Sequence, residues 1–274
     1  MSISRDLFNK ISTEDTYDVD KDRGLLLRNG SPVPYFEHEK RFSASGRKLR
    51  ADIVPKFFTY HFSAGRLELN NLVEYMRRKS TKADVQLCLG RKGEVVQLAP
   101  LHEKCWHMGR SSYGGYNSLN DYAIGIEVVN PGPLEILGDG QYKSWFNEIY
   151  DDIEYSISEG QHHIHGGKTY GWMDYTPEQI TAVTNIALAL RDVYSTELIG
   201  HDEATSRKTD PGPFSKIDDI RAILEGRDDD STPHESVVEP VNTPLIKPVE
   251  TTDVEPVKPS PVKSCNFFGF KRKK

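Results

Sequence analysis

Gly200-His201-Asp202-Glu203-Ala204-Thr205-Ser206-Arg207-Lys208-Thr209-Asp210-Pro211-Gly212 is the stretch of this chain that carries the most information. It follows a short apolar run and places a histidine, a lysine and an aspartate in one loop. Imidazole and carboxylate groups are ligands that Zn²⁺ accepts in hydrolytic sites, and a neighbouring ammonium group stabilises an oxyanion. If a further histidine converges on this loop, the sequence describes a catalytic metal centre and not a surface turn.

The residues around this loop alternate between strand and helix patterns. Apolar, aromatic and β-branched segments predict strands at Lys56–Phe62, Val85–Leu89, Glu94–Leu98, Tyr122–Val129 and Leu198–His201. Because both hairpins and longer crossovers connect these strands, the sequence predicts an α/β fold with a mixed central β-sheet flanked by helices. We expect a single catalytic domain over residues 51–226.

Three helices are expected to pack on this sheet. The clearest begins at Thr176, which is followed by a proline at the first helical position and by Gln179 at the capping-box position, and it runs to about Tyr194. Apolar residues at helical spacing predict a second helix over Leu67–Lys79. A closing helix is expected over Asp218–Leu224.

Two further residues are candidates to join the loop. His61 stands at the end of its predicted strand, and strand ends that open into loops commonly carry sites in α/β folds. The alternative is a structural histidine. Glu127 lies in an apolar strand on the same face as Ala123 and Gly125, two small residues that leave open space beside its carboxylate. This setting favours a general base, whereas the alternative is a solvent-facing or salt-bridged glutamate.

Five segments in order now resemble one family, the zinc-dependent N-acetylmuramoyl-L-alanine amidases of type 2, which include phage lysins, bacterial cell-wall amidases and peptidoglycan recognition proteins. The resemblance covers roughly Val54 to Phe214. The segments that carry it are Tyr60-His61-Phe62-Ser63-Ala64-Gly65, Glu94-Val95-Val96-Gln97-Leu98, Trp106-His107-Met108-Gly109, Ile124-Gly125-Ile126-Glu127 and Gly200–Pro213.

The resemblance implies a role for each matching residue. His61, His201 and Asp210 match the three zinc ligands, and a water would hold the fourth position. Glu127 matches the glutamate that takes a proton from that water, and Lys208 matches the lysine that stabilises the tetrahedral oxyanion. The implied cofactor is therefore Zn²⁺, and the implied substrate is peptidoglycan or a muropeptide.

The resemblance also implies substrate contacts and shows one departure. Trp106 and His107 match a position in the substrate groove, and Arg207 beside the catalytic lysine is expected to bind substrate with them. Where many members have a histidine in the strand after the first helix, this chain has Gln86, which forms hydrogen bonds but does not titrate. Residues 161–165, Gln-His-His-Ile-His, are expected to form a Gly-rich loop without bound metal.

Composition excludes several other classes of protein. With a net charge of −6, the chain lacks the basic balance of a general nucleic-acid binder. Its three cysteines are scattered and odd in number, so no disulfide framework or metal knuckle is expected. No apolar run approaches the roughly 18–20 residues of a membrane span, and residues 1–6 lack the pattern of a secretory signal. We expect a monomer that is made in the cytoplasm.

Both ends of the chain differ from this domain. Residues 1–50 are polar and are expected to form an irregular extension with one short strand at Gly24–Arg28. Residues 227–264 are rich in proline and are expected to form a disordered, semi-stiff linker. Residues 265–274 combine three phenylalanines with four basic residues, a pattern typical of weak contact with a membrane surface. The alternative is a disordered tail without a partner.

The predicted activity is hydrolysis of the amide between N-acetylmuramic acid and L-alanine by a zinc-activated water. The rivals are a recognition module without turnover and a metallopeptidase that acts within the stem peptide, although the HExxH motif of many such enzymes is missing. For the setting, the sequence favours a phage endolysin that acts on the cell wall after release. A cytoplasmic amidase that recycles muropeptides is the second hypothesis.

Overall fold

The computed structural model describes residues 15–38 and 50–226. The predicted linker and tail, with Cys265, lie outside the described residues. The central sheet is five-stranded, in the order β15-β4-β9-β5-β6. Its strands are β4 (Phe57–Phe62), β5 (Leu87–Leu89), β6 (Val95–Gln97), β9 (Ala123–Val128) and β15 (Glu197–Gly200). The first four strands in this order pair in parallel, and β5 and β6 form an antiparallel hairpin. The predicted mixed sheet is confirmed.

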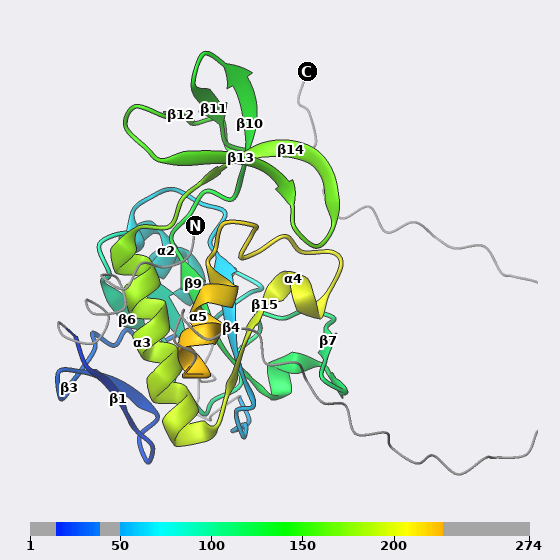
Figure 1. The fold of residues 1–274 in the computed structure, drawn as a ribbon. Coiled ribbons are helices and arrows are strands. Elements are labelled where there is room, and N and C mark those ends of the chain that lie inside the picture. The colour runs from blue at the N-terminus through cyan, green and yellow to red at the C-terminus, as the bar shows by residue number, and fades with distance from the viewer. Residues whose placement is uncertain (1–14, 39–49, 227–274) are drawn as a thin grey trace, which may run out of the picture. The chain divides into compact units, whose positions relative to one another are not determined.

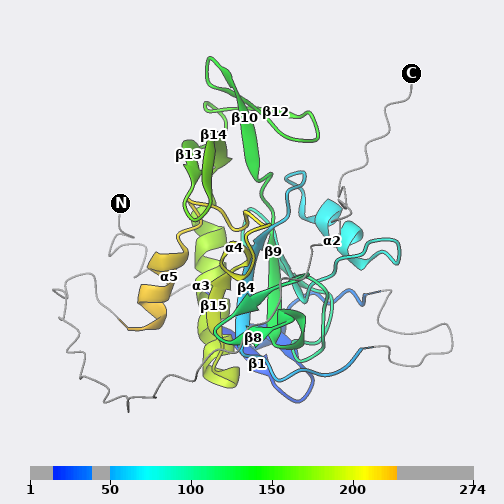
Figure 2. The ribbon, with the colours of Figure 1, turned by 90° about the vertical axis from the view of Figure 1, so that its right-hand side faces the viewer.

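Helices cover both faces of this sheet (Figure 2). The helices α3 (Pro177–Tyr194) and α5 (Ile217–Leu224) pack against one another, and α3 covers the face that carries Phe58 and Tyr60. The shorter α2 (Leu69–Arg77) packs on the opposite face, against Cys88 and Val96. The start of α3 has the predicted capping box at Thr176. The three predicted helices are thus confirmed to within two residues at either end.

The N-terminal segment has more regular structure than the sequence predicted. It forms a three-stranded antiparallel sheet from β1 (Tyr17–Asp20), β2 (Leu25–Arg28) and β3 (Ser31–Pro32). Val19, Leu26 and Val33 from this segment belong to the same buried cluster as the core of the central sheet. Gln97 ties the two together, because its side chain accepts from the Leu26 N–H at 2.9 Å and donates to the Gly24 carbonyl at 2.7 Å.

A second five-stranded sheet, in the order β12-β11-β10-β14-β13, was not predicted. Its strands are antiparallel, and in both views it lies beyond the ends of β4 and β9 (Figures 1 and 2). They are β10 (Pro133–Gly138), β11 (Gln141–Lys143), β12 (Ile149–Asp151), β13 (Ile157–His162) and β14 (Gly166–Met173). Residues 163–165 form the turn of a β-hairpin beside Gly166 and Gly167, so the predicted Gly-rich loop holds for them, whereas Gln161 and His162 belong to β13.

Short elements complete the domain. They are a two-stranded ribbon of β7 (Ser112–Tyr113) and β8 (Tyr116–Asn117), a 3₁₀ turn at Leu119–Asp121 and the helix α4 (His201–Ala204). No helix among the described residues is both long and apolar enough to cross a membrane. Cys88 and Cys105 are free buried thiols, as expected of a chain without a disulfide framework.

Candidate metal and catalytic centre

Strand register brings the first two candidate residues together. β4 and β9 pair in parallel with His61 opposite Glu127, and β5 places Cys88 opposite the same glutamate. Because side chains alternate along a strand, His61 and Glu127 project from the face opposite that of Phe58 and Tyr60. The site therefore lies on the face turned away from α3.

The remaining candidates reach this face from the end of β15. Its last residue is followed at once by His201, the first residue of α4, and the chain then returns to Asp210. Asp210 Oδ2 lies 2.7 Å from His61 Nδ1 and 2.9 Å from His201 Nδ1. All three residues are buried, and their potential ligand atoms lie within 4.8 Å of one another.

Burial sets the protonation of this cluster. It lowers the pKa of His61 to about 4, an effect that His201 reinforces, so His61 is neutral near pH 7. Burial alone would raise the pKa of Asp210, but the neighbouring His201 and His61 rings outweigh it and hold the carboxyl well below its usual pKa. A neutral imidazole and a carboxylate are the forms that bind Zn²⁺, so the donor set fits this metal.

Glu127 lies at the site but is not one of the three candidate metal ligands. Its side chain is half-buried, and Oε2 is buried without a hydrogen-bond partner among the described residues. Burial and the nearby Asp210 raise its pKa well above the usual value, while Lys208 opposes the shift. A carboxylate with an unpaired buried oxygen and a raised pKa is suited to accept a proton near neutral pH.

Gly125, one of the two small residues expected to leave space beside the Glu127 carboxylate, is itself closely packed. A Cβ atom added there would lie 2.7 Å from His107 Nδ1 and 2.8 Å from a methyl group of Val85. His107 is buried, and its Nδ1 lies 3.0 Å from His61 Nε2. Glycine at 125 therefore makes room for the His107 ring behind His61.

The two residues next to His201 fix the loop that carries Asp210. The Asp202 N–H donates to the Asp210 carbonyl at 2.8 Å. Glu203 accepts from the Gly200 N–H at 2.6 Å, and Arg221 of α5 donates two hydrogen bonds to its carboxylate. Burial, Asp210 and Glu203 raise the pKa of Asp202 to about 8.

The predicted substrate-binding residues differ in exposure. Trp106 is 49% exposed, and the Lys104 ammonium lies 4.3 Å from its ring centroid. Lys208 and Arg207 are exposed, and the Arg207 guanidinium donates to the Arg110 carbonyl at 2.8 Å. His107, by contrast, is buried and contacts His61.

The hairpin histidines form a second cluster that sequence reasoning missed, because their partner Asp202 is distant in sequence. His162 Nε2 lies 3.1 Å from Asp202 Oδ2, and His163 Nε2 lies 3.7 Å from the same oxygen. However, His162 Nδ1 accepts the N–H groups of Ile164 and His165. The proton of this neutral ring must then sit on Nε2, which leaves no lone pair for a metal. These contacts instead hold the hairpin against the loop that contains Asp202 and Thr209.

Gln86, the departure from the family pattern, is buried within the sheet. Its Oε1 accepts from the Gly125 N–H at 2.8 Å, and its Nε2 donates to the Glu103 carbonyl at 2.9 Å. Both groups of the carboxamide are therefore used to hold neighbouring backbone. Gln86 supports the strand of Glu127, and the hydrogen bonds of its side chain go to backbone groups and not to His61, His201 or Asp210.

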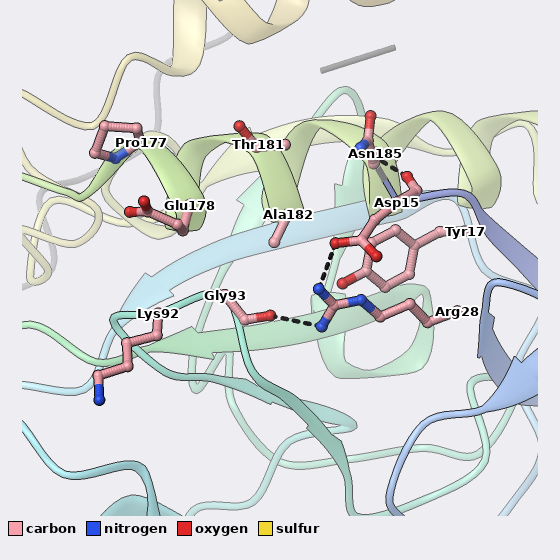
Figure 3. Close-up of a pocket in the computed structure, with 10 residues that line it drawn as sticks. All are labelled: Asp15, Tyr17, Arg28, Lys92, Gly93, Pro177, Glu178, Thr181, Ala182 and Asn185. Carbon is pink, nitrogen blue, oxygen red and sulfur yellow. Dashed lines mark hydrogen bonds and ion pairs between the residues drawn. The ribbon is translucent and has the colours of Figure 1, made fainter. Parts of the chain in front are cut away.

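A pocket of about 160 Å³ lies elsewhere, between the N-terminal segment and α3 (Figure 3). Arg28 crosses it and is already paired with Asp15 and with the Gly93 carbonyl. None of the candidate catalytic residues lines this pocket. The main charged groups that cross the pocket, Arg28 and Asp15, are paired with one another, so we place the candidate centre at the buried His-His-Asp cluster and not here.

Fold and site together define an α/β protein with a buried His-His-Asp cluster beside an unpaired glutamate. The family model described as N-acetylmuramoyl-L-alanine amidase matches residues 51–213, more than half of the chain. The chain belongs to this family.

Curated relatives share about half of the chain. The 1,6-anhydro-N-acetylmuramyl-L-alanine amidase AmpD of Citrobacter freundii is 30% identical over 139 residues, which are 50% of this chain and 55% of the relative. The N-acetylmuramoyl-L-alanine amidase AmiD of Escherichia coli is 28% identical over 127 residues, 45% of this chain and 35% of the relative. This chain thus matches only part of the length of either relative.

Solved structures show a more distant likeness. AmiD from E. coli in complex with an anhydro-N-acetylmuramic acid peptide gives a TM-score of 0.43 at 21% identity, over 64% of this chain and 60% of the other. The amidase LysC from Clostridium intestinale gives 0.45 at 13% identity, over 70% and 97%.

Proposed function

We propose that this protein hydrolyses the amide bond between the lactyl group of N-acetylmuramic acid and L-alanine, with zinc as its cofactor. The observation that carries the proposal is the convergence of His61, His201 and Asp210 beside the unpaired oxygen of Glu127. Membership of the amidase family, and relatives whose names specify muramyl-L-alanine amidases, support this bond as the target.

The residues divide the work as follows. His61, His201 and Asp210 would hold Zn²⁺, which would supply a water of lowered pKa and polarise a carbonyl. Glu127 would accept a proton from the attacking water as its oxygen adds to the carbonyl carbon, and would pass it to the nitrogen as the C–N bond breaks. The products are a carboxylate on the lactyl side and a free amine on L-alanine. The Lys208 ammonium offsets the negative charge on the carbonyl oxygen.

Product analysis tests this assignment. Purified peptidoglycan is digested with the metal-loaded protein, with and without a chelator, and the fragments are identified by mass spectrometry. We expect intact stem peptides with a free L-alanine amine, formed only without the chelator. Asp210→Ala should abolish both zinc binding and release, whereas Asp192→Ala, on the exposed side of α3, should do neither. Fragments cut within the stem peptide would indicate a metallopeptidase and not an amidase. Binding without release of fragments would indicate a recognition module.

The biological setting is a separate proposal. We propose an endolysin that reaches the wall after release, and the name of the AmpD relatives gives the rival, an amidase of 1,6-anhydro muropeptides. Rates on intact cell walls and on soluble 1,6-anhydro muropeptides separate the two. Faster turnover of the walls supports the endolysin, and turnover confined to the soluble fragments overturns it. Truncation at residue 226 tests whether the segment beyond it, proposed to touch membrane surfaces weakly, contributes to this preference.

A further inference from the structure

The loop that contains His107 and Met108 contacts both histidines of the cluster from behind. His61 Nε2 lies 3.0 Å from His107 Nδ1, and His201 Nε2 lies 3.2 Å from the Met108 carbonyl oxygen. In both histidines the other nitrogen, Nδ1, is the one that faces Asp210. His107 thus contacts the Nε2 atom of His61, and the next residue, Met108, contacts the Nε2 atom of His201.

Hydrogen-bond chemistry determines where the protons of these rings sit. A carbonyl oxygen only accepts, so the Met108 carbonyl favours a proton on His201 Nε2. His107 Nε2 lies 3.3 Å from the Ala123 carbonyl, which places the proton of His107 on that nitrogen and makes its Nδ1 an acceptor for a proton on His61 Nε2. The Asp210 carboxylate is the competing acceptor at Nδ1 of both rings. With the proton held on Nε2, both histidines direct an Nδ1 lone pair toward the position that a cation would take.

The backbone of this loop is fixed independently of the metal. The N–H groups of His107 and Met108 both donate to Asn120 Oδ1, each at 2.9 Å, and Asn120 is itself buried. The His107 ring stands perpendicular to that of His61, with centroids 5.1 Å apart. Only a glycine at 125 leaves room for it.

We propose that His107 is a positioning residue, which with the Met108 carbonyl holds both histidine ligands in the tautomer and orientation that a metal requires. This rests on the proposed metal centre and replaces the expected contact of His107 with substrate. Hydrogen bonds from the remote nitrogen of a metal-binding histidine fix its ring and raise its basicity, and their loss typically weakens metal binding 10–100-fold.

The test measures zinc affinity and tautomers in the full chain. Zn²⁺ is titrated in competition with a chromophoric chelator for the wild type, His107→Leu, His107→Asn and the matched control His102→Leu. Long-range ¹H–¹⁵N spectra of the metal-free proteins report which ring nitrogen of His61 carries the proton. We expect His107→Leu to bind zinc about 10–100-fold more weakly and to lose the Nε2-protonated form. His107→Asn, whose amide oxygen can replace Nδ1 as an acceptor, should recover most of the affinity, and the control should match the wild type.

Two results would overturn the proposal: equal zinc affinity of His107→Leu and wild type, or a wild-type His61 protonated on Nδ1. If the wild type bound no zinc, the proposed metal centre would fail, while the spectra would still decide the role of His107. Thermal unfolding of each metal-free variant separates a misfolded protein from a folded one with weak binding, and failure of His107→Asn to restore affinity in a folded state also counts against the proposal.

Discussion

Gly125→Ala adds one methyl group and should lower both the free energy of unfolding and the affinity for zinc. The new Cβ would lie 2.7 and 2.8 Å from two atoms of the His107 ring and 2.8 Å from a Val85 methyl. Neither neighbour yields easily, because Val85 is fully buried and the His107 ring is held at both nitrogens. Overpacking of this kind costs about 1–3 kcal/mol. A displaced His107 ring would also release His61, so zinc affinity should fall together with stability.

Gly65→Ala is the matched control for this substitution. A Cβ there would meet its nearest atoms at 3.7 and 3.8 Å, an ordinary contact. Since alanine restricts the unfolded chain more than glycine does, this variant should be neutral or up to about 1 kcal/mol more stable. Urea unfolding of the metal-free proteins gives the two free energies, and chelator competition gives the two zinc affinities. A Gly125→Ala protein with the stability and affinity of Gly65→Ala would refute the packing of His107 described above.

Four further outcomes are expected. Glu127→Gln should lower kcat by about 10²–10⁴-fold with zinc content unchanged, and a rate near that of the wild type would remove Glu127 as the base. Lys208→Gln should lower kcat by about 10²–10³-fold, whereas Lys92→Gln, on a distant exposed turn, should not change it. Gln86→Leu should cost about 1–3 kcal/mol in urea unfolding for each backbone group left unpaired, without loss of bound zinc. In chelator, the free energy of unfolding should fall as pH drops from 6.5 to 4. The unfolded chain protonates His61 below pH 6.5, whereas the buried ring resists to about pH 4, a difference of about 3 kcal/mol. Urea unfolding at each pH measures this change. A free energy of unfolding that stays constant between pH 6.5 and 4 would contradict the burial of a neutral His61.

The sequence predicted the parts of the site that depend on local pattern. Alternation in the segment around Glu127 placed it on the face opposite Ile124, Ile126 and Val128, whereas the parallel pairing of β4 with β9 that aligns it with His61 was seen only in the structure. The capping residues of α3 were equally local, and its start at Pro177 was predicted to the residue.

The parts that were missed depend on contacts between distant segments. The strands β13 and β14 are rich in glycine and polar residues, and most of their residues are exposed or half-buried, so their sequence lacks the apolar alternation of a half-buried strand. The space that Gly125 leaves by lacking a side chain is filled by the ring of His107, from a loop 18 residues earlier. Its contact with His61 follows from packing in three dimensions, which a single sequence does not encode locally.

The N-terminal sheet shows that the part of the chain matched by the family model is shorter than the part that folds together. The family model begins at residue 51, yet Leu26 and Val33 lie in the same buried cluster as the strands behind the catalytic face. A fragment cut at residue 51 would expose that cluster and leave the buried amide of Gln97 without its partners at Gly24 and Leu26. Moving this fold into another protein would therefore require the upstream segment to be included with it.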